Sequence, residues 1–233
     1  TEVSLKTYCL EISGEFACFT RPEMKVERVS YDVITPSAAR AVFEAILWKP
    51  AIRWRITKIE VLNPFRWINV RRNEVGAVAS TRSVDPGLYV EDERQQRAGL
   101  FLRDVAYRIH AHFELRDPGF HKPNFPHLSG HRVNDGENDL NALPDNNAAK
   151  FMSIFERRAA KGQCVNQPYL GCREFACSFC LVDDPTTERS PIDETRDLGW
   201  MLYDLDYTNS ADPQPHFFRA RLEQGAMDLD GVE

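Results

Sequence analysis

Residues 28–75 read RVSYDVITPSAARAVFEAILWKPAIRWRITKIEVLNPFRWINVRRNEV, and this stretch decides the fold. Thr35 and Pro36 suit the N-cap and first turn of a helix, because a threonine oxygen can accept a backbone amide and proline has no amide to satisfy. Apolar residues then recur at helical spacing until Pro50, which cannot continue a helix. The pattern predicts a helix over residues 36–48.

A cationic strand and part of a hairpin follow this helix. From residue 52 onward, apolar and basic side chains alternate, which is the period of a half-buried strand with a charged outer face. The phase of the alternation shifts near Thr57, so we expect a bulge there. Segment 65–75 predicts one arm of a hairpin with Arg71 and Arg72 near its tip.

Basic residues are concentrated between Arg21 and Arg82. This segment holds twelve basic and six acidic residues, a local charge of +6 in a chain whose net charge is −6. Such asymmetry favours a surface that faces a polyanion, although arginines also occur as ordinary solvated residues on a strand face. Trp48 and Trp67 could stack on bases, but buried tryptophans are commoner. We expect a single groove of phosphate contacts from Arg21, Lys25, Arg28, Arg40, Arg53, Arg55, Arg71 and Arg72.

Four further segments complete a first domain. Residues 5–19 predict two strands joined by a tight turn at Ser13-Gly14. Residues 105–115 and 173–182 alternate as strands, and 147–162 predicts a helix that begins at Asn147 and ends at Gly162. The order strand, helix, strand, strand, helix, strand is the ferredoxin-like βαββαβ unit. Its open antiparallel sheet is the platform by which RNA-recognition modules bind single-stranded RNA.

The whole chain is predicted to have an α+β fold. A ferredoxin-like (RRM-like) RNA-binding domain spans 1–182, and a smaller antiparallel β portion with strands over 198–207 and 216–227 spans 183–233 and ends in an acidic tail. Segment 117–146 is a loop rich in Pro, Gly, Asn and Asp, and loops of this length are usually functional or disordered. It carries a cationic set of His121, Lys122, His127, His131 and Arg132.

Composition limits the class of protein. No apolar run approaches the roughly 20 residues that span a bilayer, and the N-terminus lacks a signal-peptide pattern, so we expect a cytoplasmic protein without a membrane. The C-x4-C-x2-C spacing of Cys172, Cys177 and Cys180 also occurs among iron–sulfur ligands. However, a strand over 173–182 would send Cys177 and Cys180 to opposite faces. This favours buried free thiols and predicts neither metal nor cofactor.

Five sequence blocks carry a family resemblance. The chain resembles the CRISPR-associated (Cas) family-five protein of type I-C systems, subtype d within the RAMP superfamily. The resemblance implies a ferredoxin-like N-terminal domain and a smaller β domain. It also implies a subunit of the Cascade interference complex that cuts precursor guide RNA (pre-crRNA) and stays on the 5′ handle of the guide. The blocks are SYDVITPSAARAVFEAILWKP (30–50), LNPFRWINVRRNEV (62–75), QQRAGLFLRDVAYRIHAHFEL (95–115), FERRAAKGQC (155–164) and QPYLGCREF (167–175).

The chemistry that the resemblance implies is metal-independent endoribonuclease cleavage. A ribose 2′-hydroxyl attacks the adjacent phosphate and leaves a 2′,3′-cyclic phosphate, which requires a base, an acid and a cation beside the phosphorane. Family members supply these groups with a Tyr or His before the Trp-Lys-Pro that ends the first helix, and with a Lys-His pair at the second helix. Here these positions are Leu47 and Lys150-Phe151, so only Lys150 remains.

Three explanations fit this departure. Other groups carry catalysis, with His112 and His110 on the 105–115 strand or the histidines of loop 117–146 as candidates, although histidines on a wet strand face are often merely polar. Alternatively, cleavage is slow and relies on Lys150 and on positioning of the RNA. The third explanation is that the chain only binds and caps the guide RNA, without cleaving it. The catalytic candidates are therefore Lys150 and His112. The expected partners are CRISPR repeat RNA or crRNA and the backbone and large subunits of the complex, with double-stranded target DNA as a further candidate.

Overall fold

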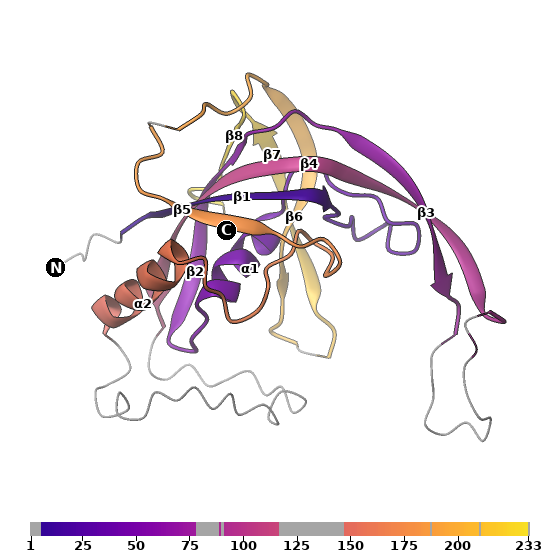
Figure 1. Cartoon of the computed structure of the whole chain (residues 1–233), viewed down its shortest axis with the longest axis horizontal. Coiled ribbons are helices and arrows are strands. Elements are labelled where there is room, and N and C mark those ends of the chain that lie inside the picture. Colours follow the sequence, from indigo (N-terminus) through magenta and orange to yellow (C-terminus); the bar gives the residue numbers. More distant parts are fainter. Residues whose placement is uncertain are drawn as a thin grey trace.

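An antiparallel sheet of six strands organises the molecule (Figure 1). The computed structural model describes residues 6–77, 89, 91–116, 147–186, 188–209 and 211–232. The strand order in the sheet is β5-β1-β4-β2-β8, and β3 pairs with β4 beside this path. The strands are β1 (Tyr8–Ala17), β2 (Ile52–Val61), β3 (Trp67–Val75), β4 (Arg94–Leu115), β5 (Ser178–Val182) and β8 (Ala226–Asp228).

Two interleaved β-α-β units build the centre of this sheet. β1 and β2 are both antiparallel to β4, which lies between them, and α1 (Pro36–Ile46) connects them. β4 and β5 likewise flank β1, and α2 (Ala148–Ala160) connects them. This split arrangement is the ferredoxin-like unit, so the predicted α+β fold is confirmed.

A separate two-stranded antiparallel sheet consists of β6 (Arg196–Asp206) and β7 (Gln214–Leu222). The predicted strands over 198–207 and the first part of 216–227 correspond to this pair. The chain then returns to the main sheet, where β8 pairs with β2. The division of the chain after residue 182 remains a prediction.

Both helices lie on the same face of the main sheet and cover its core (Figure 1). Trp54 of β2 is the centre of this core, with its ring 4.7 Å from Phe155 and 4.9 Å from Phe43 between centroids. Its indole nitrogen donates a 2.9 Å hydrogen bond to the carbonyl of Leu47, which satisfies its buried polar group. Burial of each such side chain stabilises the fold by about 1.5–3 kcal/mol.

The helix boundaries follow from local chemistry. The Thr35 hydroxyl accepts from the amide of Ala38, as its sequence position predicts, but α1 ends at Ile46, two residues earlier than expected, because Leu47 is extended with φ −146°. Asn147 caps α2 and Gly162 follows its end with φ +64°, so the predicted second helix is confirmed.

The prediction of two strands around Ser13-Gly14 is wrong. β1 runs without interruption, and both residues pair with β4, Ser13 with Ala106 and Gly14 with Val105. The glycine serves a close approach rather than a turn. A Cβ atom at residue 14 would lie 2.5 Å from Cδ1 of Leu170.

β4 is longer than the predicted strand because it pairs with two partners in succession. β2 pairs with its second half and β3 with its first half, so it begins at Arg94 rather than at residue 105. The predicted bulge near Thr57 is confirmed by a register shift between Ile56 and Lys58. Arg71 and Arg72 lie in the body of the β3–β4 ribbon rather than at its tip, because the pairing continues to Val75.

The predicted strand over 173–182 is shorter in the structure. Only residues 178–182 form β5. The residues before it form a loop, which is joined to the end of β1 by a hydrogen bond from the amide of Cys18 to the carbonyl of Leu170. Cys177 is buried and Cys180 is exposed. Among the described residues, no group of three or more His, Cys, Asp or Glu could hold a metal ion. No helix in this part of the chain has the length and apolarity to cross a membrane.

Candidate nucleic-acid interface

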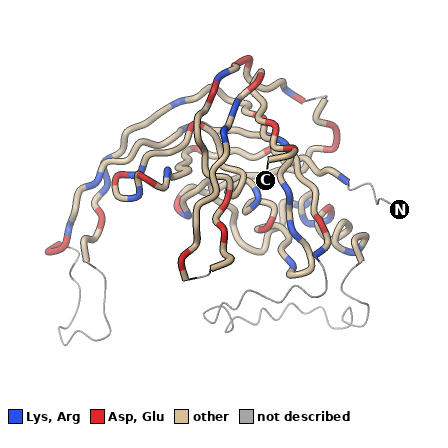
Figure 2. The backbone as a smooth tube through the Cα atoms, turned by 180° about the vertical axis from the view of Figure 1, so that it is seen from behind, with Lys and Arg blue, Asp and Glu red and all other residues tan. Residues whose placement is uncertain are grey.

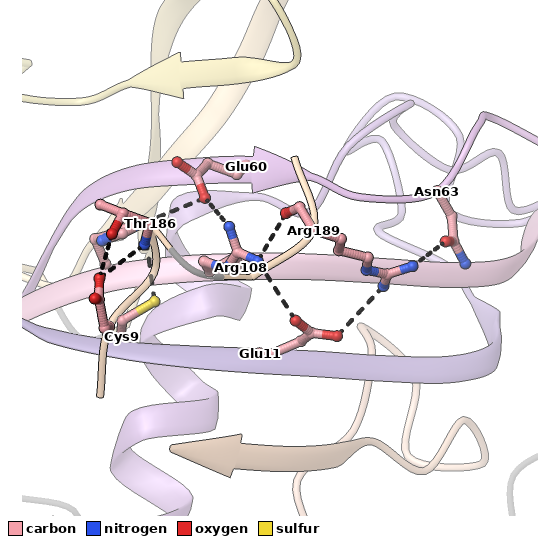
Figure 3. A network of polar contacts seen from close by, with 9 residues as sticks. Cys9, Glu11, Glu60, Asn63, Arg108, Thr186 and Arg189 are labelled. Carbon is pink, nitrogen blue, oxygen red and sulfur yellow. Dashed lines mark hydrogen bonds and ion pairs between the residues drawn. The ribbon is translucent and has the colours of Figure 1, made fainter. Parts of the chain in front are cut away.

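The sheet face opposite the helices is not the open platform that we expected. The side chain of Arg108, in the middle of β4, is only 2% exposed. It donates to Glu60 Oε2 at 3.1 Å and to the backbone carbonyl of Arg189 at 3.0 Å (Figure 3). The guanidinium of Arg189 in turn reaches Glu11 and Asn63 at 3.3 and 3.1 Å. The segment around Arg189 therefore covers the sheet centre, and bases cannot stack there.

Glu60 is the electrostatic centre of this network. Burial opposes its ionisation, but hydrogen bonds from His110 and Lys58 outweigh that effect and lower the pKa of Glu60 to about 2. Lys58 Nζ lies 2.6 Å from Glu60 Oε1, and His110 Nε2 lies 3.4 Å from Oε2. Because these charges satisfy one another, we regard the network as structural.

A first group of predicted cations surrounds the start of β2. Arg40 of α1 pairs with both carboxylate oxygens of Asp204, and Arg55 Nε lies 3.0 Å from Glu114 Oε2. Arg53 has no carboxylate at ion-pair distance within the described part of the chain. Burial lowers its pKa, and the charges of Arg55 and Arg40 lower it further. The surface formed by Arg40, Arg53 and Arg55 therefore carries excess positive charge at Arg53.

A second group lies where the β3–β4 ribbon leaves the sheet. Arg72 pairs with Glu174 and lies over the ring of Phe101, 4.9 Å from its centroid. Arg28 donates a 3.0 Å hydrogen bond to Cys172 Sγ. A hydrogen bond from Cys18 and the charge of Arg28 lower the pKa of Cys172 to about 6, although burial opposes this change. Arg71 is exposed.

Arg21 and Lys25, the two remaining cations of the predicted set, lie in the segment between β1 and α1. Arg21 lies 4.5 Å over the ring of Tyr31 and pairs with Asp32 at 3.4 Å, whereas Lys25 is exposed. The side chains of Trp48 and Trp67 are 56% and 38% exposed, so both are accessible to a base.

The eight cations do not lie in one compact groove. Arg55 stands opposite His112 and Arg71 opposite Ala98, which are fourteen residues apart along β4. At about 3.3 Å per residue this separates the two groups by about 45 Å of strand. Figure 2 shows basic positions both on the projecting ribbon and on the body of the molecule. An extended ligand is needed to touch both groups.

The two catalytic candidates lie on opposite faces of the sheet. Phe113 packs against Phe151 of α2, so the neighbouring His112 points to the other face, where it lies 3.9 Å from Glu114. Lys150 belongs to the first turn of α2, on the helical side. These two residues therefore approach the sheet from different sides.

The positions that correspond to the missing proton-transfer groups belong to the core. Leu47 is 0% and Phe151 is 2% exposed, and neither side chain can transfer a proton. The cationic set of loop 117–146 lies outside the described residues. Sequence reasoning missed Asp204, which pairs with Arg40, because nothing in the sequence signals that this acid comes to face α1.

The fold and the surface define a ferredoxin-like protein with two arginine groups suited to a polyanion. The family described as CRISPR-associated protein (Cas_Cas5), in its Cas5d form, matches residues 7–128 and 133–230. The chain belongs to this family.

Two curated relatives match nearly the whole chain. A protein of Mannheimia succiniciproducens named CRISPR pre-crRNA endoribonuclease Cas5d is 46% identical over 234 residues, which cover 94% of this chain and 93% of the relative. A protein of the same name from Thermus thermophilus is 38% identical over 237 residues, 94% of this chain and 90% of its own.

Solved structures support the fold. A crystal structure of a CRISPR-associated protein superposes with a TM-score of 0.63 at 23% identity and covers 96% of this chain and 91% of its own. A chain of a CRISPR RNA-guided surveillance complex superposes with a TM-score of 0.51 at 13% identity over 92% of this chain and 88% of its own.

Proposed function

We propose that this chain binds CRISPR repeat RNA, cleaves pre-crRNA and then stays on the 5′ handle of the guide in the type I-C interference complex. The observation that carries the proposal is the 46% identity, over 94% of the chain, to a protein named pre-crRNA endoribonuclease. The arginine groups supply the phosphate contacts that RNA binding requires. In this proposal the partners are crRNA and the other subunits of the complex, and the protein acts in the cytoplasm.

The cleavage step that we propose is attack of the 2′-hydroxyl on the adjacent phosphate, with a 2′,3′-cyclic phosphate as product. Lys150 is in the first turn of α2, where the helix N-terminus adds positive potential, so it can stabilise the charge that develops on the phosphorane. Because residues 47 and 151 are Leu and Phe, this site lacks the proton-transfer groups that other family members have there. RNA positioning then supplies part of the rate. His112, on the other face, is assigned to the surface around Arg55.

A second candidate function is a non-catalytic subunit that caps the 5′ handle and contacts target DNA. The burial of Leu47 and Phe151 favours it, because both positions have become apolar core. In this case binding is retained and the RNA remains intact.

Incubation of the purified protein with its cognate repeat RNA in a chelator separates the two functions. A single cut that leaves a cyclic phosphate supports the endoribonuclease, and tight binding of intact RNA supports the non-catalytic subunit. Absence of binding at modest salt contradicts both.

A further inference from the structure

We propose that the pocket between α1, β2 and β6 binds one phosphodiester of the RNA, and that Asp204 occupies the phosphate position until RNA displaces it. The residues that line the pocket are Pro36, Ser37, Arg40, Arg53, Trp54, Arg55, Ile56, Tyr203 and Asp204. The identity of the ligand as RNA rests on the proposed function. The pocket itself rests on the contacts below.

Asp204 holds Arg40 in the geometry that a phosphate would take. Both terminal nitrogens of Arg40 donate to the Asp204 carboxylate, Nη2 to Oδ1 at 3.1 Å and Nη1 to Oδ2. Carboxylate and phosphate oxygens accept such paired bonds from a guanidinium in the same way. Arg40 Nε also lies 3.3 Å from Glu44 Oε1, an ion pair that does not depend on Asp204.

Arg53 gives the pocket a positive charge that no ion pair among the described residues neutralises. It is half-buried beside Arg40 and Arg55, and within the described chain no carboxylate lies at ion-pair distance from it; the charge of Asp204 offsets those of Arg40 and Arg55 only in part. Partial burial of a guanidinium without an ion-pair partner, next to other cations, is unfavourable. The pocket therefore favours an anion, and the single charge of Asp204 is shared between its ion pair with Arg40 and its longer-range attraction to Arg53.

The backbone around Asp204 is locally irregular. The register between β6 and β7 shifts between Leu202 and Asp204, an irregularity of the kind that redirects a side chain. The Asp204 side chain is 19% exposed and also accepts from the amide of Leu205. It can therefore turn away from Arg40 and keep a local hydrogen bond. Because Asp204 belongs to β6, its displacement by RNA at α1 and β2 would change a contact of the β6–β7 sheet.

The test measures the affinity of repeat RNA across a salt series for Asp204→Asn, Arg53→Gln and the double variant. Glu223→Gln is the control. Glu223 follows the end of β7 that lies opposite the start of β6, away from Asp204, and it forms an ion pair with Arg221. Asp204→Asn keeps the shape and the acceptor oxygen but removes the competing charge. Thermal unfolding of each variant confirms that the fold is intact.

We expect Asp204→Asn to bind RNA at least about threefold more tightly than wild type, a gain of roughly 0.7 kcal/mol. The slope of log affinity against log salt stays as in wild type, because the same phosphate is bound in both proteins. Arg53→Gln flattens this slope by about 0.7, the value for one phosphate on a single strand, and the double variant loses the gain in affinity. Affinity of Asp204→Asn equal to that of Glu223→Gln, or weaker affinity with unchanged thermal stability, overturns the inference.

A second probe separates this inference from the proposed function. Inorganic phosphate, compared with chloride at equal ionic strength, raises the melting temperature of wild type by more than the general stabilisation that it gives Arg53→Gln, and it raises that of Asp204→Asn by more again. If this pattern holds and no variant binds repeat RNA, the pocket stands and the proposed function fails. If phosphate has no such effect and RNA binding is independent of Asp204, the pocket is refuted.

Discussion

At the residue scale, Leu47 and Phe151 show what a sequence can and cannot reveal about a site. Their identities already exclude proton transfer. Their burial, which only the structure reveals, shows that both have become part of the core around Trp54 and Phe113. Any surviving catalytic chemistry must therefore lie on accessible groups nearby, and Lys150 is the one that the family pattern retains.

Lys150→Ala tests this role. If the chain cleaves repeat RNA, loss of the ammonium removes stabilisation of the phosphorane, and the single-turnover rate falls by about a hundredfold. RNA affinity changes by much less, because one of many phosphate contacts is lost. Lys161→Ala, which follows the other end of α2, is the matched control. An unchanged cleavage rate in Lys150→Ala contradicts the assignment.

Glu60 gives a pH prediction. Its pKa is lowered from 4.5 to about 2 in the folded protein, so its contribution to stability is fully present above pH 4.5 and is lost as the pH falls toward 2. Allowing for solvent screening, this contribution is on the order of 2 kcal/mol. Glu60→Gln should therefore flatten the loss of unfolding free energy over this window, measured by urea denaturation at each pH. The exposed Glu15→Gln should not, and equal curves for the two variants contradict the network.

Arg108 explains why residue-level exposure was partly mispredicted. The alternation of strand residues puts Arg108 on the same face as His110 and His112, which we expected to be wet. Ion pairs to Glu60 and Glu11 and the carbonyl of Arg189 instead bury it. The partner at residue 189 lies too far along the chain for periodicity to reveal.

At the element scale, local signals predicted the helices and the strand over 52–61, because caps, proline and periodicity act within a few residues. β1 was mispredicted because the role of Gly14 depends on a loop that is distant in sequence. That loop approaches the end of β1 at Gly171, which has φ +82°.

Gly171→Ala should detach this loop. A Cβ atom there would lie 2.0 Å from the carbonyl oxygen of Cys18, and the positive φ adds backbone strain. We expect a loss of about 3 kcal/mol in unfolding free energy by urea denaturation. Gly162→Ala has a similar positive φ but no atom within 4 Å, so it should lose only about 1 kcal/mol. Equal losses would show that the close approach is unimportant.

At the scale of the whole molecule, the charge is divided between a basic early segment and an acidic remainder. The segment from Arg21 to Arg82 carries +6 and the rest −12. The sequence predicted which residues carry this charge, but not that β4 separates them into two groups with about 45 Å of strand between them. An extended nucleic-acid strand can contact both groups, whereas a small anion can reach only one.

The affinity of repeat RNA across a salt series is the most direct test of the central claim that RNA is bound through both arginine groups. The variants are Arg53→Gln with Arg55→Gln, Arg71→Gln with Arg72→Gln, and all four together. Each pair should flatten the slope of log affinity against log salt by about 1.4, and the two effects should add because the groups are far apart. No affinity at modest salt, or slopes that neither pair changes, would contradict the account.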